Sequence, residues 1–329
     1  MPHTVLITGA AGFIGFHLAK RILAETDAAV VGFDNLNAYY DVSLKESRLD
    51  LLRRSERFTF VRGDLTDRMR VFDTFEQFAP DVVVNLAAQA GVRYSLENPE
   101  AYMDSNVTGF FHMLEAARRF PVNHFVYASS SSVYGNRTAA PFSETDSVDR
   151  PVSLYAATKR FDELAAYTYA HLYGIQCTGL RFFTVYGPFG RPDMAYFSFT
   201  RKILAGEPIQ IFNHGDLYRD FTYIDDVVTA LMRILPAPPA KDDAGDRCRL
   251  MNIGNAHPEK LLHFLDVLQT VIGQRADVRF LPMQPGDVYL TAADTTRIEQ
   301  EFGFAPNTSI ETGLQAFYDW YRAYYGVTE

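Results

Sequence analysis

Six short runs rich in β-branched and aromatic residues alternate with stretches of helical spacing through the first half of the chain. The runs are apolar almost throughout, instead of at every second position, which is typical of the strands of a parallel sheet covered on both faces. Repeated strand–helix units of this kind predict a doubly wound α/β sheet of the Rossmann type. The runs are TVLIT (4–8), AVVGF (29–33), FTFVRG (58–63), DVVVNLA (81–87), HFVYAS (124–129) and QCTGLRFF (176–183).

The pattern changes after the sixth run, where prolines and glycines increase and the apolar runs shorten. We therefore predict two domains, a Rossmann domain over 1–183 and a smaller α/β substrate-binding lobe over 184–329. The stretch FTYIDDVVTALMRIL (221–235) has helical spacing, and we expect a segment of about 220–236 to pack back on the first domain. The polar stretch APPAKDDAGD (237–246) is expected to be an exposed loop.

Charge and cysteine content argue against several classes of protein. The sequence carries 31 basic and 40 acidic residues, a net charge of −9, which disfavours binding to nucleic acid or to an anionic membrane surface. No apolar run approaches the roughly 20 residues that span a bilayer. Cys177 and Cys248 are the two cysteines, and they indicate reduced thiols of a cytoplasmic protein rather than a disulfide framework. The motif VLITG begins within a few residues of Met1, so we expect no signal peptide.

The first apolar run leads directly into TGAAGFIG, where Gly9, Gly12 and Gly15 have the spacing G-x-x-G-x-x-G. Glycines between a strand and a helix permit a tight turn and a close approach of the backbone to a pyrophosphate. Asp34 lies just past the second run, nineteen residues after Gly15, where a carboxylate accepts both ribose hydroxyls and repels a 2′-phosphate. We therefore predict NAD rather than NADP as the cofactor. Asp64, after the third run, is predicted either to contact adenine or to cap a helix.

Tyr155 and Lys159 stand four residues apart in YAATK and therefore share one face of a helix. A tyrosine with the ordinary pKa of about 10 is a poor base at neutral pH, but an adjacent ammonium would stabilise its phenolate. Such a pair also occurs by chance on the surfaces of helices. It becomes specific when a serine or threonine ends the preceding strand, and YASSSSVYG (127–135) supplies one.

Taken together, these motifs resemble those of the extended short-chain dehydrogenase/reductase family, and the resemblance covers nearly the whole chain. TGAAGFIG, ASSSSVYG, YAATK, RFFTVYGP and RDFTYIDD occur in the family's order. Within the family the chain is most similar to the UDP-glucuronate 4-epimerases, on the stretches AQAGVRYSLENP, SLYAATK, TVYGPFGRPDMAYFSFTRKIL, FNHG and MQPGDV. The resemblance implies an isomerase with bound NAD and a UDP-uronic acid substrate.

The resemblance also implies a mechanism. Ser130 would bond the sugar O4 while Tyr155 takes the proton of the 4-hydroxyl and a hydride passes from C4 to NAD. The 4-keto sugar would then turn over in the site and receive the hydride on its opposite face, which interconverts UDP-glucuronate and UDP-galacturonate. Ser131 and Ser132 occupy positions where sugar-nucleotide dehydratases carry an Asp–Glu pair and UDP-glucuronate decarboxylases a glutamate at the second. Dehydration and decarboxylation are therefore both disfavoured.

The same resemblance assigns further substrate contacts. Thr184 and Arg191 are the candidates for the uronate carboxylate, with a local Arg191–Asp193 ion pair as the alternative. Arg93 is another candidate, for which a structural ion pair with Glu97 is at least as good a reading. The remaining substrate positions are Arg219 at the diphosphate, Gln210 and Phe212 at the uracil ring, Gln284, where many UDP-galactose epimerases carry arginine, and Asp287.

The resemblance also implies a dimer and further contacts with the cofactor. A homodimer is expected, with a seam formed by the helices around 107–118 and 161–173. The eight histidines have no ligand-like spacing, so no metal is expected. The further residues expected to contact NAD are Phe13, Ile14, Asn35, Leu65, Leu86, Ala87, Ala88, Asn106 and Ser129, besides Tyr155 and Lys159.

Three other functions stay open beside the uronate epimerase. One is a UDP-glucose/UDP-galactose 4-epimerase, against which Arg191 speaks. Another is a UDP-glucuronate decarboxylase, against which Ser132 speaks. The third is a non-enzymatic NAD-sensing regulator that has kept the fold. The intact set of Ser130, Tyr155 and Lys159 argues against that last possibility.

Overall fold

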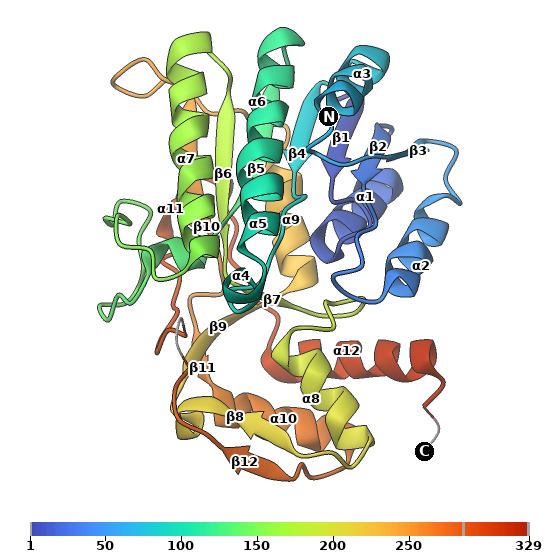
Figure 1. The fold of residues 1–329 in the computed structure, drawn as a ribbon, viewed down its shortest axis with the longest axis vertical. Coiled ribbons are helices and arrows are strands. Elements are labelled where there is room, and N and C mark those ends of the chain that lie inside the picture. Colours follow the sequence, from blue (N-terminus) through green and yellow to red (C-terminus); the bar gives the residue numbers. More distant parts are fainter. Residues whose placement is uncertain (1, 285–286, 328–329) are drawn as a thin grey trace. The chain divides into compact units, whose positions relative to one another are not determined.

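The computed structural model describes residues 2–284 and 287–327, which divide into two compact units (Figure 1). The first unit consists of Met1–Gly135, Ser147–Phe182 and Val228–Met251. The second consists of Asn136–Asp146, Phe183–Val227 and Asn252–Glu329. The chain therefore crosses between the units more often than a single boundary at residue 183 would require.

A seven-stranded sheet forms the centre of the first unit, in the order β10-β6-β5-β4-β1-β2-β3 (Figure 1). From β6 to β3 each pair of neighbouring strands is parallel. The predicted doubly wound α/β fold is thereby confirmed. The strands are β1 (Thr4–Thr8), β2 (Ala29–Asp34), β3 (Phe58–Arg62), β4 (Val82–Asn85), β5 (His124–Ser130), β6 (Cys177–Phe182) and β10 (Cys248–Ile253), whose last residues belong to the second unit.

Strand β1 marks the point where the order of the strands reverses. Ile7 lies opposite Gly32 of β2 on one side and opposite Val84 of β4 on the other. Ligands of open α/β sheets bind outside the carboxyl ends of the strands at such a switch point. The glycine turn after β1 and the segment 86–88 after β4 therefore lie where a dinucleotide is expected.

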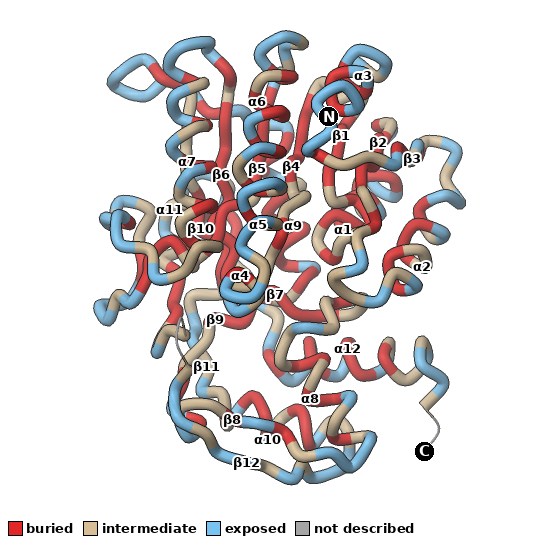
Figure 2. The backbone as a smooth tube through the Cα atoms, in the orientation of Figure 1, coloured by how far each residue is buried: buried red, intermediate tan, exposed pale blue. Residues whose placement is uncertain are grey.

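Helices cover both faces of this sheet because its strands are apolar on both sides. Helix α7 packs on β5 and β6, and α6 lies beside it (Figure 1). The strands are buried along most of their length, while exposure lies on the outer sides of the helices (Figure 2). The helices are α1 (Phe13–Glu25), α2 (Val42–Leu52), α3 (Arg68–Phe78), α4 (Tyr94–Glu97), α5 (Pro99–Tyr102), the π-helical η1 (Met103–Thr108), α6 (Gly109–Arg119), the 3₁₀ turn η2 (Ser131–Tyr134) and α7 (Leu154–Tyr173).

The second unit contains two small sheets and the helices packed on them. One sheet has the order β11-β9-β7 and the other pairs β12 with β8. Helices α10 and α12 pack on each other. The elements are β7 (Thr184–Tyr186), α8 (Ala195–Leu204), β8 (Ile209–Ile211), the 3₁₀ turn η3 (Phe212–Gly215), β9 (Tyr218–Tyr223), β11 (Pro258–Lys260), α10 (Leu261–Ile272), β12 (Val278–Phe280), α11 (Thr296–Phe302) and α12 (Ile310–Tyr325).

The helix predicted over 221–235 is wrong at its start. Phe221–Tyr223 end strand β9, where they pair with Thr184–Tyr186 of β7, and helix α9 (Ile224–Ile234) begins only afterwards. Pairing with β7 is a tertiary contact that overrides local helical spacing. Residues Val228–Met251 belong to the first unit. The packing of the segment 220–236 on the first domain stays a prediction. The stretch 237–246 contains neither helix nor strand.

Candidate active site

The glycine-rich turn after β1 leaves no room for a side chain at any of its three glycines. Gly9 has a φ of +71°, and a Cβ added to it would lie 2.8 Å from the backbone nitrogen of Ala87. A Cβ on Gly12 would lie 2.9 Å from the Gly9 carbonyl oxygen, and one on Gly15 only 2.2 Å from it. Helix α1 begins at Phe13 with no capping side chain on Gly12, so the amides of its first turn are not satisfied within the helix. The turn is a cradle suited to a pyrophosphate.

Asp34 ends β2 beside this turn, and two backbone amides orient its side chain. Oδ2 accepts a hydrogen bond from the Ala11 amide at 3.0 Å, and Oδ1 accepts one from the Leu36 amide at 2.9 Å. Burial raises the pKa of this carboxyl, although both amides and the nearby Lys45 and Arg48 act to lower it. A carboxylate offers about four lone-pair positions, so two remain for the ribose hydroxyls that the sequence assigned to it. The residues present therefore fit NAD.

Two buried cations on α2 brace the segment around Asp34. The Arg48 guanidinium donates through Nη1 to the Ala11 carbonyl at 2.7 Å and to the Tyr40 hydroxyl at 2.8 Å. The Lys45 ammonium donates to the carbonyl and side-chain oxygens of Asn37 at 2.7 and 2.8 Å. Because Ala11 lies within the glycine-rich turn, this hydrogen bond from Arg48 fixes the backbone of the turn. Sequence reasoning missed both residues.

Asp64 follows β3 and is hydrogen-bonded to another predicted cofactor residue, Asn35. The Asn35 amide donates to Asp64 Oδ2 at 2.7 Å, and the backbone and hydroxyl of Thr66 donate to Oδ1. Burial acts to raise the pKa of Asp64, but these hydrogen bonds outweigh burial and lower it. The alternative that Asp64 caps the following helix is wrong, because Asp67 accepts from the Arg70 amide as the cap of α3. The adenine contact stays a prediction.

The segment after β4 is hydrogen-bonded to the end of β1, at the edge of the sheet where the glycine-rich turn lies. The Leu86 amide donates to the Thr8 carbonyl at 3.2 Å, and the Ala87 amide donates to the Thr8 hydroxyl at 3.1 Å. Leu86, Ala87 and Ala88 are each partly exposed, as are Ile14 and Asn35, whereas Phe13 and Leu65 are buried. This segment runs beside the glycine-rich turn and leaves its surface accessible.

Asn106 sits in the π-helical η1 and ties this segment to α7. Its amide donates to the Gln89 carbonyl at 3.1 Å and to the Thr158 hydroxyl at 3.0 Å, while its oxygen accepts from the Gln89 amide at 2.8 Å. Because both amide hydrogens are used, the Asn106 side chain braces the site, and its direct contact with NAD stays a prediction.

Ser129, near the end of β5, faces a buried ion pair. Its hydroxyl donates to Glu163 Oε1 at 2.7 Å. Glu163 binds Arg181 at both oxygens, at 2.8 and 2.9 Å, and the Arg181 guanidinium lies 4.8 Å from the centre of the Tyr134 ring. The Ser129 side chain therefore anchors the strand end to α7 and β6, and its contact with NAD stays a prediction.

Ser130 to Ser132 turn out of the sheet as η2 begins. The Ser130 hydroxyl accepts from the Ser132 amide and donates to the Ser132 hydroxyl, both at 3.2 Å. Ser131 and Ser132 are partly exposed, and Ser130 is nearly buried. Helix α7 packs against both β5 and η2. This edge of the sheet thus presents a row of hydroxyl groups beside the helix that carries Tyr155.

Tyr155 and Lys159 lie in the first half of α7, whose start is capped by Ser153. Tyr155 is partly exposed, and its ring meets the Tyr102 ring edge to face at 6.0 Å between centroids. Lys159 is buried, and its ammonium donates to the Ala128 carbonyl and to Asp162 Oδ2, both at 3.0 Å. The lysine thus bridges α7 and β5, the strand that carries Ser130.

In the second unit, Thr184 and Arg219 stand on neighbouring strands. Thr184 opens β7 and pairs with Phe221 of β9, two residues after Arg219. The Arg219 guanidinium donates to the Tyr218 carbonyl at 2.9 Å and to the Tyr289 carbonyl at 3.2 Å. Arg219 therefore lies beside the segment that begins at Asp287.

Arg191 takes the local ion pair that the sequence left as an alternative. Its Nε lies 3.0 Å from Asp193 Oδ1 and its Nη2 lies 2.5 Å from Oδ2. The loop is anchored by Phe189, which has a φ of +54° and packs on Trp320 at 4.9 Å between ring centroids. A role of Arg191 at a substrate carboxylate stays a prediction, as does that of Thr184.

The two residues predicted to contact the uracil ring lie at the small β8–β12 sheet. Gln210 lies in β8 opposite Arg279, and Phe212 begins η3 directly after it. The Leu281 amide donates to the Ile211 carbonyl at 2.8 Å. The segment just before Gln284 therefore lies beside the end of β8. The Asp287 amide in turn donates to the Gln284 carbonyl at 3.2 Å. Arg93 lies elsewhere, in the first unit, exposed at the start of α4, and its role stays a prediction.

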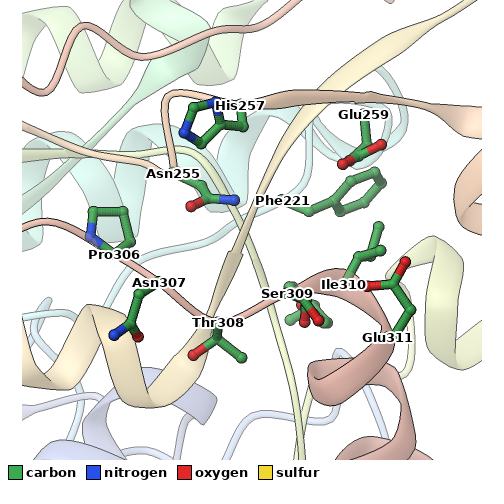
Figure 3. A pocket seen from close by; sticks show the side chains of 11 residues that line it. Phe221, Asn255, His257, Glu259, Pro306, Asn307, Thr308, Ser309, Ile310 and Glu311 are labelled. Atoms are coloured by element: carbon green, nitrogen blue, oxygen red, sulfur yellow. The ribbon is translucent and has the colours of Figure 1, made fainter.

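A separate pocket of about 360 Å³ lies within the second unit (Figure 3). None of the predicted substrate residues lines it. Its polar side chains include Asn255, His257, Glu259, Ser309 and Glu311 around the start of α12. Among residues 2–284 and 287–327, no cluster of histidine, cysteine, aspartate and glutamate could hold a metal ion. Over the same residues, no helix has both the length and the apolar character needed to cross a bilayer.

Sequence reasoning missed the buried charges that support this site. Asp162 and Glu163 follow Lys159 by three and four residues, a spacing that places them beside it on a helix and could have found them. Lys45 and Arg48 share one face of α2 with the buried Leu44, Leu49 and Leu52, and this spacing could have indicated that they are buried.

Comparisons with known proteins agree with this geometry. A family model described as the NAD dependent epimerase/dehydratase family matches residues 5–254. The chain is 46% identical to the probable UDP-glucuronate 4-epimerase of Rhizobium meliloti, over 97% of each chain. It is 33% identical, with a TM-score of 0.90, to the crystal structure of UDP-glucuronic acid 4-epimerase from Bacillus cereus in complex with UDP-glucuronic acid and NAD, over 98% of this chain and 100% of that one. The UDP-glucose 4-epimerase of Thermotoga maritima gives 28% identity and a TM-score of 0.87, over 98% and 99%. The chain belongs to the NAD-dependent epimerase/dehydratase family.

Proposed function

We propose that the protein is an NAD-dependent isomerase that interconverts UDP-glucuronate and UDP-galacturonate at C4. Relatives named as UDP-glucuronate 4-epimerases match the chain along nearly its whole length. The solved one was crystallised with UDP-glucuronic acid and NAD. The glycine-rich turn and Asp34 provide a matching cofactor site.

The observation that carries the proposal is the set of groups at the carboxyl end of β5. Ser130, Ser131 and Ser132 offer hydroxyls and no carboxylic acid, beside the helix that bears Tyr155 and Lys159. The nearby carboxylate of Glu163 is bound at both oxygens to Arg181. Elimination of a hydroxyl calls for a carboxylic acid and a second base that this edge lacks, whereas epimerisation needs no proton-transfer group beyond Tyr155.

The chain's own residues perform the proton transfer. Tyr155 removes the proton of the sugar 4-hydroxyl, and the Lys159 ammonium stabilises the phenolate that does so. Ser130 donates a hydrogen bond to O4 and orients it. NAD, when bound, supplies the hydride acceptor and donor at C4. The substrate residues hold the nucleotide while the sugar presents first one face and then the other.

The uronate is distinguished from a neutral hexose by its carboxylate. Arg191 can bind a carboxylate at two points, because its guanidinium already binds Asp193 in that way. Thr184 would add a neutral hydrogen bond. For the nucleotide, Arg219 is assigned to the diphosphate, and Gln210 and Phe212 to the uracil ring.

The proposal is tested by incubating the purified protein with UDP-glucuronate without added cofactor and following the products by NMR. UDP-glucose is run in parallel. We expect UDP-galacturonate to form without release of CO₂, and NAD to be recovered from the protein after denaturation. A pentose product would identify a decarboxylase. Turnover of UDP-glucose alone would identify a neutral-hexose epimerase, and no turnover of either would contradict the proposal.

A homodimer is a second part of the proposal. Helices α6 and α7 lie side by side in the first unit and expose apolar side chains to solvent, among them Phe111, Leu164 and Leu172, which are 44%, 51% and 60% exposed. Burying such a face against a second copy would remove it from water. Sedimentation should give a dimer, and Leu164→Glu should give a monomer. A wild-type monomer would refute this part. The cytoplasmic location stays a prediction from the cysteine content.

A further inference from the structure

The catalytic lysine has a buried carboxylate as its neighbour on the same helix. Lys159 Nζ and Asp162 Oδ2 are 3.0 Å apart, and the two side chains are only 4% and 1% exposed. The second partner of Lys159 is the carbonyl of Ala128, also at 3.0 Å. An ammonium has three hydrogens, so these two contacts fix the direction of the third.

Asp162 uses only half of its hydrogen-bonding capacity. Within the described part of the chain, Oδ1 is buried and has no hydrogen-bond partner. Neither a backbone amide nor a second cation therefore secures the negative charge, in contrast to Glu163 one residue further on. Burial raises the pKa of Asp162 to about 7, against the lowering by Lys159. The charge on this carboxyl can change within the working range of pH.

Asp162 is the group that balances the charge of Lys159, because its other neighbours are either neutral or already paired. On α7, Glu163 is held by Arg181 of β6, by Arg160 and by Ser129. Tyr127 of β5 is buried, and burial raises the pKa of its hydroxyl well above the ordinary value, so it stays neutral. From η1 the neutral amide of Asn106 reaches Thr158.

We propose that Asp162 is a positioning residue for the Tyr155–Lys159 pair: its carboxylate aims the ammonium and sets how much of the ammonium's charge reaches the Tyr155 hydroxyl. With Asp162 ionised, the buried pair is neutral and the phenolate of Tyr155 receives little stabilisation. With Asp162 protonated, the ammonium's charge is uncompensated and the phenolate is favoured. As the pH falls, protonation of Asp162 therefore counteracts protonation of Tyr155. The inference rests on the proposed function, because it takes Tyr155 and Lys159 as the catalytic pair.

The test titrates the tyrosinate absorbance of Tyr155 in the NAD-bound protein. The spectrum of a Tyr155→Phe variant in the same background is subtracted, which removes the other tyrosines. In the wild type we expect a titration spread over a wider pH range than a single proton gives, because two coupled groups share it. In Asp162→Asn we expect a normal one-proton titration with its midpoint about one pH unit lower, since the ammonium is then always uncompensated. Asp104→Asn, which removes an exposed acid from η1, is the matched control and should leave the curve unchanged.

A second pair of measurements separates aiming from charge. Asparagine keeps an acceptor for the ammonium, so Asp162→Asn should keep kcat within a few-fold at its own optimum. Asp162→Leu keeps neither acceptor nor charge and should lose at least about tenfold in kcat with KM little changed. Equal kcat values for the two variants would overturn the positioning role. Equal Tyr155 titration curves for the wild type and Asp162→Asn would overturn the electrostatic role of Asp162. A wild-type curve that fits a single proton would also overturn that role, and this result does not need a folded variant. The titration needs no turnover, so failure of the epimerase assignment is read separately in the NMR assay.

Discussion

Arg191 and Asp193 form a two-point ion pair, with Nε 3.0 Å from Oδ1 and Nη2 2.5 Å from Oδ2. The pair is partly exposed, at 24% and 28% for the two side chains. Asp193 thus occupies the fork of the guanidinium that a substrate carboxylate would need. Binding of a uronate carboxylate through the same two nitrogens would require the exchange of one carboxylate for another.

Replacing Arg191 by glutamine should therefore separate the two candidate substrates. We expect kcat/KM for UDP-glucuronate to fall by about 100-fold, because a two-point charged hydrogen bond is lost. Any activity on UDP-glucose should change by less than a few-fold. Steady-state assays with both substrates measure this. A variant that keeps its full activity on the uronate would show that Arg191 serves only the ion pair.

Asp193→Asn tests the exchange from the other side. An exposed ion pair is worth about 0.2–1 kcal/mol, so its removal should lower KM for UDP-glucuronate by up to about fivefold. The value for UDP-glucose should not move. A rise of KM for the uronate would mean that Asp193 holds Arg191 in its working position instead of competing for it.

A side chain at Gly15 should distort the glycine-rich turn and prevent the binding of NAD. A Cβ there would lie 2.2 Å from the Gly9 carbonyl oxygen and 3.1 Å from the Ala10 Cα, so backbone must move. We expect Gly15→Ala to cost about 1–3 kcal/mol in folding and to lose bound NAD. The measurement is NAD released per protein chain, together with the melting temperature. Ala24→Gly, at an exposed position of the same helix, should cost less than about 1 kcal/mol and retain NAD. Full NAD content in Gly15→Ala would contradict the assigned role of the turn.

The sheet and the glycine turn could be predicted from the sequence because their signals are local. Continuous apolar runs mark buried parallel strands, and TGAAGFIG places its glycines between a strand and a helix. The start of α9 could not be predicted, because Phe221–Tyr223 become strand only by pairing with β7. Asp64 and Asp67 also could not be told apart as caps, since either side chain can accept from an amide two or three residues on.

The buried charges show a second limit of sequence reasoning. A lysine or arginine is ordinarily exposed, so residue type alone does not mark Arg48, Lys159 or Arg181 as buried. Burial of each depends on partners that the fold brings together, such as Glu163 for Arg181 across α7 and β6. Ser130 and Tyr155 can be recognised in the sequence as candidate catalytic residues, whereas the pairing within the ionic framework behind them depends on the fold.

Leaving one buried charge of that framework unpaired should strongly destabilise the first unit. Arg181 and Glu163 are each 1% exposed and are joined by two hydrogen bonds. Arg181→Met leaves Glu163 buried with one cation fewer, and we expect a loss of about 3–5 kcal/mol in the free energy of unfolding. The double variant with Glu163→Met should lose less than the single one, because no unpaired charge remains. Urea denaturation measures both. A double variant that is less stable than either single variant would contradict this account.

His124 should make the first unit sensitive to acid. It is fully buried at the start of β5, its Nδ1 lies 3.1 Å from the Leu235 carbonyl, and its Nε2 lies 2.7 Å from the Thr178 hydroxyl. The Thr178 hydroxyl also accepts from Arg249 Nε at 3.1 Å, so its own hydrogen is directed at the imidazole. The ring is therefore neutral, donating through Nδ1 and accepting through Nε2. Burial and the nearby Arg249 lower the pKa of His124 from 6.5 to about 4.

The sign of the pH dependence follows from this depressed pKa of His124. Below pH 6.5 the imidazole of His124 is protonated in the unfolded chain, whereas in the folded chain it stays neutral until about pH 4. Stability should therefore fall as the pH drops from about 6.5 to 4, by about 3 kcal/mol from this residue, and then level off. Urea midpoints measured across this range should show the slope in the wild type. His124→Gln should be less stable at pH 8 but flatter between pH 6.5 and 4, whereas His3→Gln, at an exposed position, should keep the wild-type slope. A His124→Gln curve parallel to that of the wild type would mean that other groups govern the acid sensitivity.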